Sequence, residues 1–176
     1  PVLSGGQRFE TAFGTFLAPN ISPSSAGIGD WSDAELIHAI RAGIGPGGRH
    51  LYPAFPYTTY IKSDPQDIAD LVAYLRTLPA DPTESLPHEV GFPFNIRRAL
   101  GGWKVLYLRD EWMLTEAPTP QLERGRYLVE ALGHCAECHT PRNALGGPVL
   151  AQWMGGAENP NGDGRSPAFD PGHLDW

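Results

Sequence analysis

Apolar residues recur at helical spacing in several stretches of the chain. The first stretch begins with the S-x-x-E capping pattern of Ser32 and Glu35 and ends before Gly43. The second covers residues 64–78 and begins with an Asp-Pro pair, which is typical of a helix start. Both patterns predict amphipathic helices that bury one face.

Helical spacing returns over residues 95–107 and 120–132, although Gly101 and Gly102 interrupt the first of these two stretches. No stretch alternates convincingly between apolar and polar residues, so no strand is predicted. The loops between the helices contain too many aromatic residues for flexible linkers, which indicates that they fold over something. These residues are Trp31, Tyr52, Phe55, Tyr57 and Tyr60.

Composition sharpens this expectation. The 176 residues include 21 Gly and 18 Pro but only 2 Cys, with 41% hydrophobic and 19% charged residues. Such a chain is globular, with short elements and long loops that two cysteines cannot cross-link. A core built from so little regular structure often surrounds a cofactor.

Charge and hydropathy limit the partners. The formal net charge is -7, from 13 basic and 20 acidic residues, and no segment is basic enough to follow a phosphate backbone. We therefore expect no nucleic acid partner. No apolar run approaches the roughly 20 residues that span a bilayer, so no transmembrane helix is predicted. The chain opens at Pro1 without a signal-peptide pattern, which we interpret as a mature chain or a fragment.

A weak internal repeat suggests two homologous units. Three landmarks recur in the same order, at offsets of 150, 148 and 145 residues: 3–6 as 153–156, 19–23 as 167–171, and 30–31 as 175–176. Residues 1–31 and 151–176 would then be the same part of two units. The first unit would lack its beginning and the second its end, so we expect an internal fragment of a longer protein.

The residues Cys135-Ala136-Glu137-Cys138-His139 have the spacing C-x-x-C-H, the attachment pattern of c-type haem. Two cysteines three positions apart on a helical turn point the same way and can form thioethers with the two vinyl groups of one haem. His139 is then held beside the ring, where an imidazole nitrogen can bind the iron as proximal ligand. Covalent attachment would also supply the missing core.

Three other sites could use the same residues. A dithiol redox site is expected near a βαβ pattern, which is absent here. A zinc site built from His134, Cys135, Cys138 and His139 would strain a tetrahedron, because its ligands follow one another so closely. A structural disulfide is possible in an oxidising compartment. The spacing, the histidine that follows and the loop-rich composition together favour haem attachment.

Neighbouring residues suggest lesser roles. Glu137 and Arg142 are expected in solvent, although Arg142 could pair with a haem propionate. The only methionines are Met113 and Met154, and we interpret Met154 as a packing residue rather than a sixth iron ligand.

Four segments together resemble the multihaem cytochrome c subunits of bacterial periplasmic dehydrogenases, such as the alcohol and gluconate dehydrogenases. They are residues 13–23, 27–32, 50–57 and 133–143. The resemblance implies tandem all-α cytochrome c-like domains, both incomplete here: residues 1–80 from a first domain, 81–118 as a connecting segment, and 119–176 from a second domain. The haem motif of the first domain would lie upstream of Pro1, so a second haem is expected in the full protein.

The resemblance also implies roles for single residues. Pro19 and Pro167 look like the loop proline whose carbonyl orients the proximal histidine, which would fix the tautomer of His139. Gly125 and Tyr127 look like part of the N-terminal helix of the second domain. Phe55 stands where related chains often carry methionine. The distal ligand of a haem in the first domain is therefore His50, His38, Lys62, a residue outside this sequence, or none. His50 is the best of these candidates, although we interpret it as an ordinary loop histidine.

The expected function is electron transfer from a dehydrogenase catalytic subunit toward quinone or a terminal oxidase, without catalysis by this chain. The expected location is the periplasm, with peripheral membrane association if the segment around 92–107 lies on a bilayer; packing of that helix across both domains is the preferred interpretation. The alternatives are a haem enzyme or ligand sensor with an open sixth position, and a zinc- or disulfide-stabilised binding module.

Overall fold

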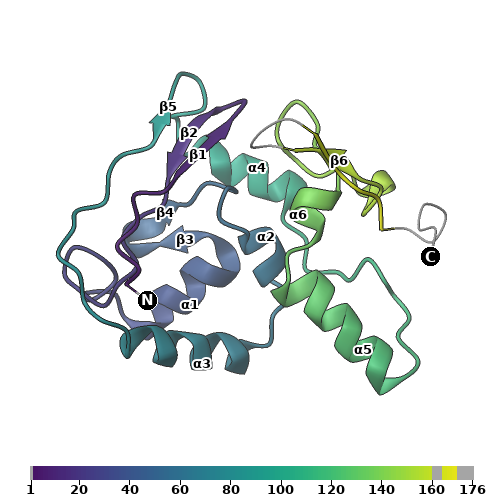
Figure 1. Cartoon of the computed structure of the whole chain (residues 1–176), viewed down its shortest axis with the longest axis horizontal. Coiled ribbons are helices and arrows are strands. Elements are labelled where there is room, and N and C mark those ends of the chain that lie inside the picture. Colours follow the sequence, from purple (N-terminus) through teal and green to yellow (C-terminus); the bar gives the residue numbers. More distant parts are fainter. Residues whose placement is uncertain (1, 160–163, 170–176) are drawn as a thin grey trace.

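Helices form most of the regular structure in the computed structural model, which describes residues 2–159 and 164–169. The helices are α1 (Asp33–Ala42), α2 (Tyr57–Tyr60), α3 (Pro65–Arg76), α4 (Ala99–Tyr107), α5 (Pro120–Tyr127) and α6 (Ala136–His139). A π-helical turn, Leu128–Leu132, continues α5, and short 3-10 turns lie at Pro46–Gly48 and Leu150–Gln152. In Figure 1, α1, α2 and α3 lie together, while α5 projects away from them. Among the described residues, no helix is long and apolar enough to cross a membrane.

The predicted helix caps are present. The Ser32 side chain accepts from the Glu35 backbone N–H, the Glu35 carboxylate accepts from Ser32 N–H, and Gly43 ends α1 in the left-handed conformation. Asp64 caps α3 through the backbone N–H of Gln66. The local sequence therefore predicted the starts of α1 and α3 correctly. Helix α4 begins at Ala99, later than the expected start at residue 95.

The expectation that the chain lacks strands was wrong. Strands β1 (Arg8–Thr11), β2 (Gly14–Leu17) and β5 (Glu89–Val90) form an antiparallel sheet in that order. Two smaller antiparallel pairs join β3 (Ile44–Gly45) to β4 (Arg49–His50) and β6 (Ala157–Glu158) to β7 (Arg165–Ser166). The longest of these strands has four residues, which is too short to show a period-two pattern.

The main hydrophobic core lies where α1 packs on α3. Its buried members are Ile28, Leu36, Ile40, Ile68 and Val72. Arg76 closes one end of this core by donating to the carbonyl oxygen of Ile28 at 2.9 Å and pairing with Asp33 at 3.0 Å. The core thus belongs to the first predicted domain and holds its loops in place.

Helix α4 of the connecting segment contacts both parts of the chain. Lys104 Nζ donates to the carbonyl oxygens of Ala42 and Gly43, at the end of α1. On the other side, Trp103 Nε1 donates to Leu145 O at 2.8 Å. The helix therefore packs across residues 1–80 and 119–176, as the preferred interpretation of the sequence predicted.

Candidate cofactor site

The C-x-x-C-H motif forms the short helix α6, with Cys135 at its N-cap. The backbone N–H groups of Cys138 and His139 both donate to Cys135 O, at 3.3 and 3.1 Å, so one helical turn joins the two cysteines. Cys138 is exposed, Cys135 is partly exposed, and neither is in a disulfide. The thiols are therefore presented by a single turn, as attachment to two vinyl groups of one haem requires.

The His139 ring is held by a residue far along the chain. Its Nδ1 atom lies 2.7 Å from the carbonyl oxygen of Pro167, and its ring lies 4.2 Å from that of Phe169, centroid to centroid. Because a carbonyl can only accept, Nδ1 carries the proton and Nε2 keeps its lone pair. The imidazole is thus fixed in the tautomer that leaves Nε2 able to bind a metal.

Gly156 brings the Pro167 loop to this histidine. It has φ +81°, and a Cβ atom there would lie 3.0 Å from both Ser166 O and Ala168 N. Its N–H donates to His139 O at 2.8 Å. A glycine is required because the backbone is left-handed and a second strand of backbone passes directly beside it.

Thr140 and Met154 hold the other side of the motif. Thr140 is 2% exposed, and its hydroxyl accepts from the Met154 backbone N–H at 3.0 Å. Met154 is itself buried and its carbonyl accepts from Phe169 N at 2.7 Å. These contacts agree with the interpretation of Met154 as a packing residue.

The first part of the chain repeats this arrangement without a cysteine motif. Gly5 has φ +80°, and its Cβ would lie 2.6 Å from Pro19 O, much as Gly156 backs onto the Pro167 loop. This structural match is shifted by one residue from the sequence landmarks, which pair Gly5 with Gly155. Ile21 N donates to Leu3 O at 2.9 Å, matching the bond from Phe169 N to Met154 O. In each case a hairpin lies between the glycine and the proline. In the second copy of the repeat, Asp170, Pro171, Asp175 and Trp176 lie outside the described residues.

The sequence suggested that Glu137 and Arg142 lie in solvent, but both side chains have protein partners in the structure. The Arg142 guanidinium pairs with the Glu137 carboxylate and donates to Gly146 O at 2.7 Å. The Glu137 carboxylate also accepts from the Thr58 hydroxyl at 2.6 Å. Arg142 thus has protein partners in the structure, and its pairing with a haem propionate stays a prediction.

His50, a candidate distal ligand for a haem in the first domain, packs against α4. A Cβ atom on Gly101 would lie 3.2 Å from His50 Nε2, which places the ring against α4. Burial, and secondarily the charge of Lys104, lowers the pKa of His50. Its position fits a packed loop histidine.

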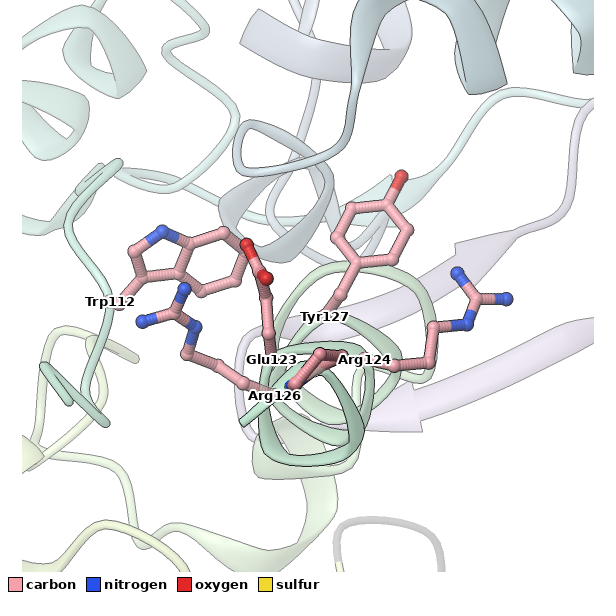
Figure 2. Close-up of a pocket in the computed structure, with 6 residues that line it drawn as sticks. Trp112, Glu123, Arg124, Arg126 and Tyr127 are labelled. Carbon is pink, nitrogen blue, oxygen red and sulfur yellow. The ribbon is translucent and has the colours of Figure 1, made fainter. Parts of the chain in front are cut away.

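The zinc alternative receives no geometric support from the described residues. Within residues 2–159 and 164–169, no group of three or more His, Cys, Asp or Glu side chains is arranged to hold a metal ion. A hollow of about 300 Å³ lies elsewhere, beside α5, and is lined by Trp112, Pro120, Glu123, Arg124, Arg126 and Tyr127. Figure 2 shows the Arg126 guanidinium against the Trp112 indole at this place. None of these residues belongs to the cysteine motif.

Comparison with known proteins shows what the first part of the chain is similar to. Residues 4–79 match the family model for cytochrome c. These residues are therefore similar to cytochrome c. The chain is also 52% identical over 176 residues to a diheme cytochrome c-type protein of Cereibacter sphaeroides, covering 99% of this chain and 60% of that relative.

Cytochrome subunits of dehydrogenases are similar as well. Identity is 38% over 164 residues with the fructose dehydrogenase cytochrome subunit of Gluconobacter japonicus, covering 89% of this chain and 33% of the relative. It is 37% over 144 residues with the gluconate 2-dehydrogenase cytochrome c subunit of Pantoea cypripedii, covering 80% of this chain and 33% of the relative. The chain therefore spans between a third and about three fifths of these relatives.

The comparisons confirm the expected resemblance to dehydrogenase cytochrome c subunits and the expected cofactor class, haem c. The cysteine motif lies outside the matched cytochrome c residues 4–79, so the match rests on independent parts of the sequence. Sequence reasoning missed Gly156 and Thr140 as supports of the motif. The repeat contained a signal for Gly156, because it pairs the two Gly-Gly landmarks.

Proposed function

We propose that residues 135–139 hold a c-type haem, with Cys135 and Cys138 as the covalent attachment points and His139 as the proximal iron ligand. In attachment, each thiol adds across a vinyl group, so that sulfur bonds one carbon and the thiol hydrogen passes to the other. The single observation that supports this best is the contact between His139 Nδ1 and Pro167 O, because it leaves Nε2 free to face a metal.

The chain's residues would serve electron transfer rather than bond-making chemistry. When bound, the haem would exchange single electrons through its iron. Cys135 and Cys138 would fasten it, and His139 would set its axial ligation. Pro167 would accept the imidazole N–H and raise the basicity of the ligand. Such residues tune a reduction potential without transferring a proton or a group to a substrate.

We further propose that residues 1–80 and 119–176 are parts of two tandem cytochrome c domains joined by 81–118. The paired Gly5–Pro19 and Gly156–Pro167 arrangements support this, as does the similarity to a protein named diheme cytochrome c-type. In the first domain, the carbonyl oxygen of Pro19 would accept a hydrogen bond from a proximal histidine upstream of Pro1. The full protein would then carry a second haem attached there.

The partner would be a dehydrogenase catalytic subunit, and electrons would leave toward quinone or a terminal oxidase. The support is the similarity to cytochrome subunits of fructose and gluconate dehydrogenases. With covalent haem and this partner, the protein would act in the periplasm. Peripheral association with the membrane is part of the same proposal.

Expression of the full gene with haem-maturation machinery tests the proposal. After denaturation, haem should remain on the wild-type polypeptide, and a C135A/C138A variant should lose the haem assigned to this motif. Retention of the same haem content by that variant would overturn the assignment. Carbon monoxide binding to the reduced protein separates the second candidate, a haem enzyme or sensor with an open sixth position: rapid binding at this haem favours the sensor.

A further inference from the structure

Glu137 reaches out of the cysteine motif to a helix nearly eighty positions earlier in the chain. One carboxylate oxygen accepts from the hydroxyl groups of Thr58 and Thr59 in α2, at 2.6 and 3.2 Å. The other oxygen pairs with Arg142. The Glu137 side chain is 19% exposed, so this carboxylate is partly desolvated and satisfied on both oxygens.

Contacts on either side of Glu137 strengthen the same junction. The His134 ring meets the Tyr60 ring edge-on, with centroids 6.2 Å apart and an interplanar angle of 84°. Ser63 Oγ donates to Ala131 O at 3.2 Å. The turn that carries the cysteines is thus docked on α2 and the residues just after it, and Glu137 supplies the charged contact within that junction.

Two properties follow from this position. Hydrogen bonds to an ionised group are roughly twice as strong as neutral ones, so the bonds to Glu137 should be stronger than the neutral bond from Ser63 to Ala131 O. A fixed negative charge in the motif also favours the oxidised, more positive state of a nearby iron centre. Glu137 therefore couples the placement of the motif to its electrostatic environment.

We propose that Glu137 is a positioning residue that fixes the haem-attachment turn of the second domain on α2 of the first domain, and so sets the relation between the two electron-transfer units. This proposal rests on the function proposed above. Its structural part, the docking of residues 135–139 on α2, does not depend on whether haem is attached.

Two variants separate charge from docking. E137Q removes the charge but keeps a carbonyl oxygen that can accept from Thr58. The T58V/T59V double variant keeps the charge and nearly the same side-chain volume but removes both hydroxyl donors. E84Q is the matched control, because it removes one carboxylate from an exposed position.

Amide hydrogen exchange measures docking in the full-length protein, with or without haem. T58V/T59V should speed exchange about tenfold in both α2 and residues 134–140, because both segments lose the same tie. A redox titration of the haem held by Cys135 and Cys138 measures the charge. E137Q should raise its midpoint potential, T58V/T59V should leave it nearly unchanged, and E84Q should change neither readout.

Wild-type exchange rates in T58V/T59V, or an unchanged potential in E137Q, would overturn the proposal. Failure of the proposed function is distinguishable, since it would appear as a wild-type protein without covalent haem. In that case the exchange experiment still decides whether Glu137 docks the motif on α2.

Discussion

The Nδ1 atom of His139 lies 2.7 Å from the carbonyl oxygen of Pro167, a residue 28 positions further along the chain. This bond fixes the imidazole before any metal arrives, because the proline loop is itself held by backbone hydrogen bonds and by the left-handed Gly156. The ligand's orientation is thus set by packing around the motif rather than by the motif alone.

Replacement of Gly156 by alanine tests that relationship. The new Cβ would press on Ser166 O and Ala168 N at 3.0 Å and occupy a left-handed backbone, which costs about 1–2 kcal/mol before any clash. Displacing the loop would weaken the bond from His139 to Pro167. We expect a lower free energy of unfolding in urea and, in the haem-bearing protein, a higher midpoint potential.

Gly102 provides the control for this substitution. It lies inside α4, and nothing lies within 4 Å of the position that an added methyl group would take. G102A should therefore stabilise the protein by about 0.5–1 kcal/mol and leave the potential unchanged. Equal effects of G156A and G102A would show that Gly156 does not support the histidine.

The sequence predicted this site unevenly, for physical reasons. The C-x-x-C-H motif is local, so its spacing could predict Cys135, Cys138 and His139 as haem-binding residues. The role of Pro167 was predicted only through the resemblance to dehydrogenase cytochrome c subunits. The contact of Glu137 with Thr58 could not be predicted, because a hydrogen bond between residues 79 positions apart leaves no pattern in one sequence.

The fold, too, was predicted in part: locally specified elements were predicted, and elements that depend on distant contacts were not. Helices α1 and α3 carry caps and apolar stripes that specify them locally, and their positions were predicted closely. Strand β2 pairs with β5, some seventy residues later, and β5 has only two residues. Such strands form because tertiary contacts bring their backbones together, not because of their own periodicity.

Gly43 should be highly sensitive to substitution. It ends α1 at φ +63°, and a Cβ there would lie 2.4–2.7 Å from ring atoms of the fully buried Tyr57. The ring has no room to move, so G43A should lower the free energy of unfolding well beyond the cost of a left-handed alanine. Gly47 has nearly the same φ, +67°, but nothing within 4 Å. In thermal or urea unfolding, G47A should cost only about 1–2 kcal/mol; similar losses in both variants would refute the role of Tyr57.

Glu130 ties residues 113–114 to the turn that follows α5. This side chain belongs to a residue only 4% exposed, and its two oxygens accept from Met113 N at 2.7 Å and Leu114 N at 2.9 Å. E130A would leave both backbone N–H groups without this acceptor, and we expect a loss of about 2–4 kcal/mol in urea unfolding. E116A removes an exposed carboxylate from the same segment and should change stability by less than about 0.5 kcal/mol. A comparably small effect of E130A would contradict the interpretation.

Lys104 should make stability depend on pH. Its residue is 8% exposed, and burial lowers the pKa of the ammonium group from 10.5 to about 8, even though Nζ donates to Ala42 O and Gly43 O. Between these two values the unfolded chain binds a proton that the folded chain does not. Stability from this group therefore rises as the pH increases from 8 toward 10.5, by at most about 1.4 kcal/mol per pH unit.

The K104M variant isolates this contribution. Burial also lowers the pKa of Lys62, which adds a rise of the same sign, whereas burial raises the pKa of Tyr57, which removes stability only at higher pH. Urea unfolding of wild type and K104M should therefore be compared at pH values of about 7.5 and about 9.5, which bracket most of the Lys104 titration. The wild type should gain clearly more stability over this interval than K104M, because only the wild type has an ammonium group at position 104 that titrates at a lower pH in the folded chain than in the unfolded chain. An equal gain in both proteins would show that the ammonium group is not the source of the pH dependence.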